Sequence, residues 1–137
     1  IMSNPLTPDA EFVELFNTSS NFTFNLSGWI FNGLDYTFPA GSFIAPRGYL
    51  VLVKDRPAFI AAYGSTIPVF GQFAGNLQSG GETITLIKPG ATAAEDVVID
   101  KVRYEGVLPW PVGTNGIANF FFFTIFFSQF CSQQGMT

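Results

Sequence analysis

The chain has 137 residues, enough for one packed domain, and 47% of them are apolar, which provides material for a hydrophobic core. Its net charge of −4 and its six lysines and arginines argue against nucleic acid as a partner, because contacts to phosphate need clustered basic side chains. With no histidine and a single cysteine, Cys131, the chain lacks the material for a disulfide within itself, a Cys/His zinc site or an imidazole base.

Short apolar runs of period two follow one another along the chain, separated by Gly, Pro, Asn and Ser. This pattern is typical of strands in a sandwich or barrel, and it predicts an all-β fold. The predicted strands cover residues 11–17, 22–26, 29–32, 36–38, 49–54, 83–88 and 96–104. Glycine is expected to provide positive φ angles in the intervening turns, which contain Gly28, Gly41, Gly48, Gly81 and Gly90.

One segment, residues 55–63, has a helical pattern. Asp55 can cap the first turn, and Pro57 suits the start of a helix. Phe59, Ile60 and Tyr63 fall at helical spacing. We therefore predict a short helix on the side of the sandwich.

The composition changes abruptly near the C-terminus. All six basic and ten acidic residues lie at or before Glu105, and the final 32 residues carry no charge. Within them, residues 117–127 (IANFFFFTIFF) form an aromatic run about half as long as the roughly 20 residues that a membrane-spanning helix needs. We therefore predict that this run does not span a membrane. It is instead interpreted as a terminal strand or as an aggregation-prone segment that the rest of the protein must cover.

Several motifs follow one another in a distinctive order: DAEFVELFN, LSGW, YTFPAGSFIAPRGYLVLVKD, GNLQSGGETITLI and WP. Their serial order resembles the lamin tail domain family, in its bacterial form, over residues 1–116. The resemblance implies an immunoglobulin-like β-sandwich that serves as a module of a larger secreted or cell-surface protein. It places the chain outside the cell or at its surface, with other protein domains or cell-surface components as partners.

Two parts of the chain depart from that family pattern. Ile1 and Met2 look like only the end of a first strand, which predicts a truncated N-terminal strand in the domain 1–116. Residues 117–137 lack the polar alternation of a final family strand. They form a separate, atypical Phe-rich segment, either a divergent strand or the product of a frame error.

Alternation within the strands also predicts which side chains face the core. The expected core positions are Val13, Leu15, Trp29, Ile84 and Leu86, together with either Leu50 and Leu52 or Val51 and Val53.

The carboxylates do not form a convincing catalytic or metal site. Glu11 and Glu14, three residues apart, fall on opposite faces of a strand and are interpreted as solvated edge charges. Asp96 and Asp100 share a face, but their Cα atoms would lie about 13 Å apart, too far to share a metal ion or a proton. We predict no catalytic residues, no metal ligands and no cofactor.

Aromatic side chains are the remaining candidates for a binding surface. Those that combine an apolar ring with a polar group are Tyr36, Tyr49, Tyr63, Tyr104 and Trp110. Packing in the core or at its rim is the favoured role for most of them. Trp110, held between two prolines, and Tyr104 are the candidates for a surface contact, although packing is the favoured role for Trp110 as well.

Three asparagines, Asn17, Asn21 and Asn25, match the acceptor pattern for N-glycosylation. Turn formation by Asn, Thr and Ser is the favoured interpretation for a bacterial protein, and glycosylation stays an alternative.

The leading hypothesis is a noncatalytic module that mediates tethering or protein–protein contact. A module that binds carbohydrate or nucleic acid is the alternative. An enzyme is a third hypothesis, against which stands the lack of a histidine base and of a Cys/His metal site. The sequence leaves the ligand and the oligomeric state open.

Overall fold

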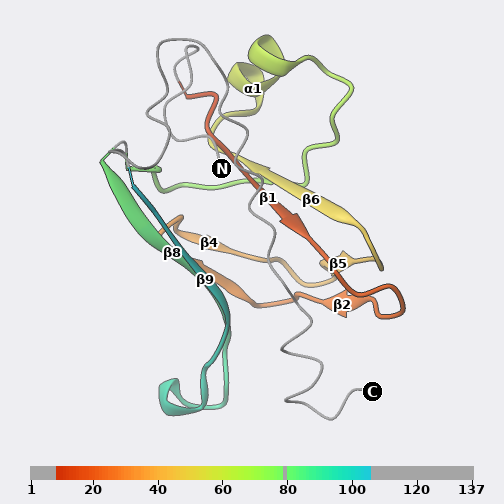
Figure 1. Ribbon diagram of the computed structural model, residues 1–137, viewed down its shortest axis with the longest axis vertical. Helices are drawn as coiled ribbons and strands as arrows, with labels where there is room; N and C mark the ends of the chain where they lie inside the picture. Colours follow the sequence, from red (N-terminus) through yellow and green to blue (C-terminus); the bar gives the residue numbers. More distant parts are fainter. Residues whose placement is uncertain (1–8, 79, 106–137) are drawn as a thin grey trace.

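The computed structural model describes residues 9–78 and 80–105 (Figure 1). Every predicted strand is present to within one or two residues at either end, and two short strands, β5 and β7, come in addition. In chain order the elements are β1 (Phe12–Phe16), β2 (Phe24–Asn25), β3 (Ile30–Asn32), β4 (Tyr36–Thr37), β5 (Phe43–Ile44), β6 (Tyr49–Val53), α1 (Arg56–Tyr63), β7 (Gly71–Gln72), β8 (Gly81–Lys88), a 3-10 turn (Ala93–Glu95) and β9 (Val97–Glu105).

The strands form three sheets around one core. Strands β1, β6 and β7 make a three-stranded sheet in the order β1-β6-β7, with β1 antiparallel and β7 parallel to β6. Strands β4, β3, β8 and β9 make a four-stranded antiparallel sheet, and β2 pairs with β5. Figure 1 shows the long pair β8 and β9 on one side of the molecule and β1 with β6 on the other. The architecture is a β-sandwich, as predicted.

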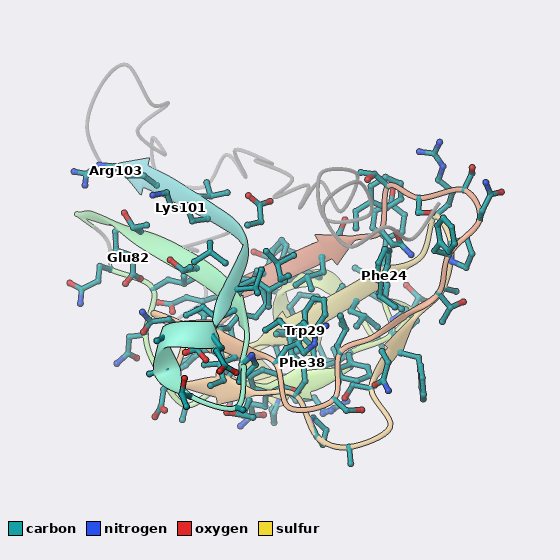
Figure 2. All side chains as sticks on the ribbon, turned by 90° about the horizontal axis from the view of Figure 1, so that it is seen from below. Phe24, Trp29, Phe38, Glu82, Lys101 and Arg103 are labelled. Atoms are coloured by element: carbon teal, nitrogen blue, oxygen red, sulfur yellow. The ribbon has the colours of Figure 1, made fainter. Side chains whose placement is uncertain are left out.

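The core lies between these sheets and confirms the predicted inward positions. Val13 and Leu15 of β1 are fully buried, and the Trp29 side chain is only 4% exposed. Figure 2 shows Trp29 and Phe38 in the interior. The buried residues of this main core are Val13, Leu15, Phe24, Leu26, Trp29, Phe31, Leu34, Phe38, Ile44, Leu52, Phe73, Leu77, Ile84, Leu86 and Ile99.

Strand β6 is buried on both faces from Val51 to Val53, so the two alternatives for its inward residues are both realised there. Leu50 and Leu52 pack against the main core. Val51 and Val53, on the opposite face, form a second cluster with Phe59 of α1. A strand buried on both faces has a continuous apolar run rather than an alternating one, which is why the sequence YLVLV left the choice open.

Helix α1 begins and ends where the sequence predicts. The Asp55 carboxylate accepts a hydrogen bond from the Ala58 amide at 2.8 Å, and the helix ends before Gly64. Phe59 is 2% exposed, whereas Ile60 is 41% exposed. The helix contacts the sheet through Phe59 and Tyr63, four residues apart, so Ile60 is not part of its packing face.

The turns confirm part of the prediction for glycine. In the turn after β2, Gly28 has φ 78° and the Trp29 amide donates to the Leu26 carbonyl at 2.9 Å. The prediction is wrong at Gly48, because Arg47 takes the positive angle, φ 56°. Gly48 is needed for space instead, since a Cβ there would lie 2.8 Å from the Ala45 carbonyl oxygen. Positive φ is also found at Gly41 and Gly81, but not at Gly90.

Candidate functional site

The described residues cover one end of the outer face of the three-stranded sheet, the face opposite the main core. At one end of β1 and β6, α1 packs on Phe12 and Val53 (Figure 1). The Phe12 ring makes edge contacts with Phe59 and Tyr63 at centroid distances of 5.5 and 5.3 Å. These contacts bury this end of the face and leave the other end for contact with solvent or a partner.

The open half of this face consists of Glu14, Phe16 and Tyr49. The register pairs Phe16 directly with Tyr49, and their rings stack with centroids 4.5 Å apart and an interplanar angle of 27°. Tyr49 is 59% exposed although it is paired in a strand. An exposed ring held by a second ring is a preorganised contact surface, because little side-chain entropy remains to be lost on binding.

Glu14 lies among apolar side chains on this open half. Its strand neighbours on the same face are Phe12 and Phe16, and its cross-strand partner is Val51. The side chain is half-buried, and desolvation raises the pKa of the Glu14 carboxyl above its ordinary value. The prediction of a solvated edge charge is therefore wrong for Glu14, because the rings on either side remove part of its hydration.

Glu11 precedes β1 and has a different environment. Its carboxylate accepts a hydrogen bond from the Leu77 amide at 3.1 Å, so it is not a purely solvated charge either. Desolvation raises the pKa of Glu11, and the Leu77 hydrogen bond and the charge of Lys54 partly oppose that rise. This carboxylate ties the start of β1 to the segment before β8. Its role is structural.

Asn17 is fully buried at the end of β1 and joins three segments. Its amide nitrogen donates to the carbonyl oxygens of Phe22 at 2.7 Å, Ala45 at 3.0 Å and Ile44 at 3.3 Å. Its side-chain oxygen accepts from the Ser19 amide at 3.0 Å, which is the turn role predicted for it. An enclosed amide with these contacts leaves no space for a glycan in the folded chain.

The other two glycosylation motifs lie at the surface. Asn21 and Asn25 are both exposed, in and beside the segment that joins β1 to β2. The Asn25 side-chain oxygen accepts hydrogen bonds from the amide and the hydroxyl of Ser27. This is the turn geometry that the favoured interpretation requires. Glycosylation of Asn21 or Asn25 stays the alternative interpretation.

Asp96 and Asp100 do not share a strand face as expected. Asp96 precedes β9 and its carboxylate accepts from the Gly90 amide at 2.9 Å. A register shift inserts one extra residue, so that Leu86 pairs with Asp100 and Ile87 with Val98. This bulge breaks the alternation on which the prediction relied. Across residues 9–78 and 80–105, the acidic and cysteine side chains form no group of three that could hold a metal ion.

Of the two aromatic residues considered for the surface, the structure describes only Tyr104. Tyr104 lies on β9 with Glu82 of β8 as its Cα partner. The structure does not describe residues 106–137, which include Trp110, Cys131 and the predicted domain boundary at 116. It does not describe Ile1 and Met2 either. Tyr36 and Tyr63 are half-buried, in keeping with a packing role. Burial raises the pKa of both tyrosine hydroxyls.

The arrangement of Glu14, Phe16 and Tyr49 was not predicted as a site. The signal was present in the sequence FVELF, whose alternation places Glu14 between two phenylalanines on one face. The register with Tyr49 needed the structure, because nothing local in the sequence specifies which residues of β6 pair with β1.

The outer face of the four-stranded sheet is more polar. Lys101 and Arg103 of β9 are exposed and pair in register with Thr85 and Thr83. Figure 2 shows both on β9, with Glu82 on the adjacent strand β8. Among the described residues, no helix has the length and apolar character required to cross a membrane.

The layered sheets and the single main core between them define an immunoglobulin-like β-sandwich domain. Comparison with known families then gives the particular one: the sequence profile of the Lamin Tail Domain matches residues 1–106, and the chain belongs to this family. The family is a noncatalytic class of structural and interaction domains. No curated protein and no solved structure gives a significant match to the chain.

Proposed function

We propose that this chain is a noncatalytic interaction module of a larger exported bacterial protein, and that it tethers that protein through protein–protein contact. The observation that carries this proposal is the match to the lamin tail domain family over residues 1–106. The open half of the outer face supports it, because its exposed ring is held in a stacked pair. Location outside the cell or at its surface is part of the proposal and is supported by the resemblance to bacterial family members.

A photo-crosslinking experiment in the source cell tests the tethering function. The photoreactive residue p-benzoylphenylalanine is placed at Tyr49, and in a matched control at Val98, which is 56% exposed on the other sheet. Crosslinks to one protein species from position 49 and not from position 98 support a specific contact. Absence of any crosslinked protein from both positions contradicts the proposal. Protease treatment of intact cells tests the location, because a surface module is cleaved while a cytoplasmic control protein survives.

Carbohydrate is the second candidate ligand, and the exposed Tyr49 ring favours it because sugars stack on such rings. Binding on a glycan array that is lost in Tyr49→Ala and retained in Val98→Ala would support this function. Nucleic acid is disfavoured by the net charge of −4.

A further inference from the structure

We propose that Glu14, Phe16 and Tyr49 form a binding site for a cationic side chain, the ammonium of a lysine or the guanidinium of an arginine presented by a partner protein. This inference rests on the proposed function and specifies the chemistry of the partner. It assigns the open half of the outer face to one ligand class.

The register brings the required groups together. Tyr49 is the cross-strand partner of Phe16, and Glu14 pairs with the residue two positions further along β6, Val51. Glu14 and Tyr49 are therefore diagonal neighbours on one face, about 7–8 Å apart with their Cβ atoms somewhat closer. A cation can bind within about 6 Å of a ring centroid and contact a carboxylate on its other side. The spacing of the two side chains suits one cationic group between them.

The surroundings of Glu14 favour a charged ligand. Its carboxylate lies beside Phe12, Phe16 and Val51 and is partly desolvated. It forms neither a hydrogen bond nor an ion pair with another described residue. Desolvation raises the pKa of this carboxyl, and the charge of the N-terminal ammonium opposes that rise in part. A half-buried carboxylate without a hydrogen bond or ion pair to another described residue gains from a cation supplied from outside.

The aromatic pair adds selectivity. Phe16 stacks against Tyr49 and holds its ring in place, while most of the Tyr49 side chain remains accessible. The ring face attracts cations through its quadrupole, and arginine in addition stacks on it. An acidic segment would be repelled by Glu14 and by the net charge of −4. The combination selects basic segments over acidic ones.

The test is a titration of the full chain, followed by NMR of the Tyr49 ring. The probes are Nα-acetyl-lysine methylamide, its arginine counterpart, and the uncharged norleucine analogue. We expect millimolar binding of both cationic probes and none of the norleucine analogue. Glu14→Gln and Tyr49→Ala should each weaken binding by about threefold or more, and Tyr49→Phe should retain it.

The matched control is Glu95→Gln, which changes the net charge equally at a carboxylate in the 3-10 turn between β8 and β9. Its binding should equal that of the unmodified chain. Thermal unfolding of each variant establishes that it is folded. Equal loss of binding in Glu14→Gln and Glu95→Gln would overturn the proposal, since it would show only a general charge effect. The proposal would also be overturned if the lysine and norleucine probes bound equally well. It would be overturned too if glucose bound and neither cationic probe did.

The same variants separate this inference from the tethering function. If Glu14→Gln leaves the crosslinked partner at Tyr49 unchanged and the lysine probe does not bind, the cation site is wrong while tethering stands. If the lysine probe binds through Glu14 but no protein partner is crosslinked, the site stands and the tethering function is wrong.

Discussion

The two faces of the sheet β1-β6-β7 are both rich in apolar side chains, but they are covered to different extents. On the inner face, Val13, Leu15 and Leu52 belong to the main core and are fully buried. On the outer face, Val51 and Val53 form a small buried cluster with Phe59 of α1, and Phe16 and Tyr49 remain at the open end. The comparison indicates that one sheet can use one face for stability and part of the other for binding.

The difference follows from what lies opposite each face. The inner face meets a second layer of strands along its length, so each side chain contacts several others. Within residues 9–78 and 80–105, the outer face meets only an eight-residue helix and the segment after it. We expect the inner face to determine global stability and the outer face to unfold locally.

Shortening a side chain on the inner face should have the largest effect. Leu15→Ala is expected to lower the free energy of unfolding by about 3–4 kcal/mol, because it removes buried methyl groups and leaves a cavity. Phe16→Ala, one residue further on the outer face, should cost about 1 kcal/mol or less. Urea unfolding measures both. Equal losses would contradict the assigned difference between the faces.

Asn17 directly follows the last residue of β1, and its substitution should have the next largest effect. Asn17→Ala is expected to cost about 2–3 kcal/mol, because the fully buried amide is lost and the carbonyl groups of Phe22, Ile44 and Ala45, the second of them buried, lose their donor. Asn17→Asp is similar in shape but places a carboxylate beside those carbonyl oxygens, so it should be more damaging at pH 7 than at pH 3. Thermal unfolding at the two pH values checks the order. A neutral Asn17→Ala substitution would show that the hydrogen bonds contribute little.

Removing the ring that anchors α1 should have a smaller and more local effect. Phe59→Ala is expected to cost about 2 kcal/mol, less than is usual for a buried phenylalanine, because only a small cluster depends on it. Hydrogen exchange should show faster exchange in α1 while amides in β1 and β6 remain protected. Ile60→Ala, at an exposed position of the same helix, is the control and should change little. Loss of protection throughout the sheet would instead make the outer layer part of the cooperative core.

The pH dependence of Glu14 should give the smallest effect. Burial raises the pKa of this carboxyl above its ordinary value of 4.5, so the folded state prefers the protonated form. Its contribution to stability is fully present below pH 4.5 and is lost as the pH rises through the raised pKa. Glu14→Gln should therefore match the unmodified chain at pH 4 and be slightly more stable at pH 7. Unfolding measured at both pH values checks this, and a variant that is less stable at pH 7 would disprove it.

Much of the local structure could be predicted from particular residues. The alternation in FVELF identified Val13 and Leu15 as core residues, and Asp55 with Pro57 located the start of α1. Strands β5 and β7 escaped prediction, because two residues are too short to show a period. The Asp96 and Asp100 pair failed at a bulge that depends on the pairing of β8 with β9.

The candidate site was half predictable. Its members Glu14 and Phe16 could be placed on one face from the sequence, and Tyr49 was already among the aromatic candidates. Their proximity depends on a cross-strand register between residues more than thirty positions apart, which no local pattern encodes.

By itself the sequence determined the class of fold, the order of most strands, the helix and its cap, because these depend on alternation, turn residues and capping close along the chain. Only the tertiary structure decided that β6 is buried on both faces from Val51 to Val53, that α1 covers only one end of the outer face, and that Glu14 and Tyr49 are diagonal neighbours. Those features arise from contacts between distant segments. The energies of these contacts depend on which surfaces pack against each other, and that packing is established only when the whole domain folds.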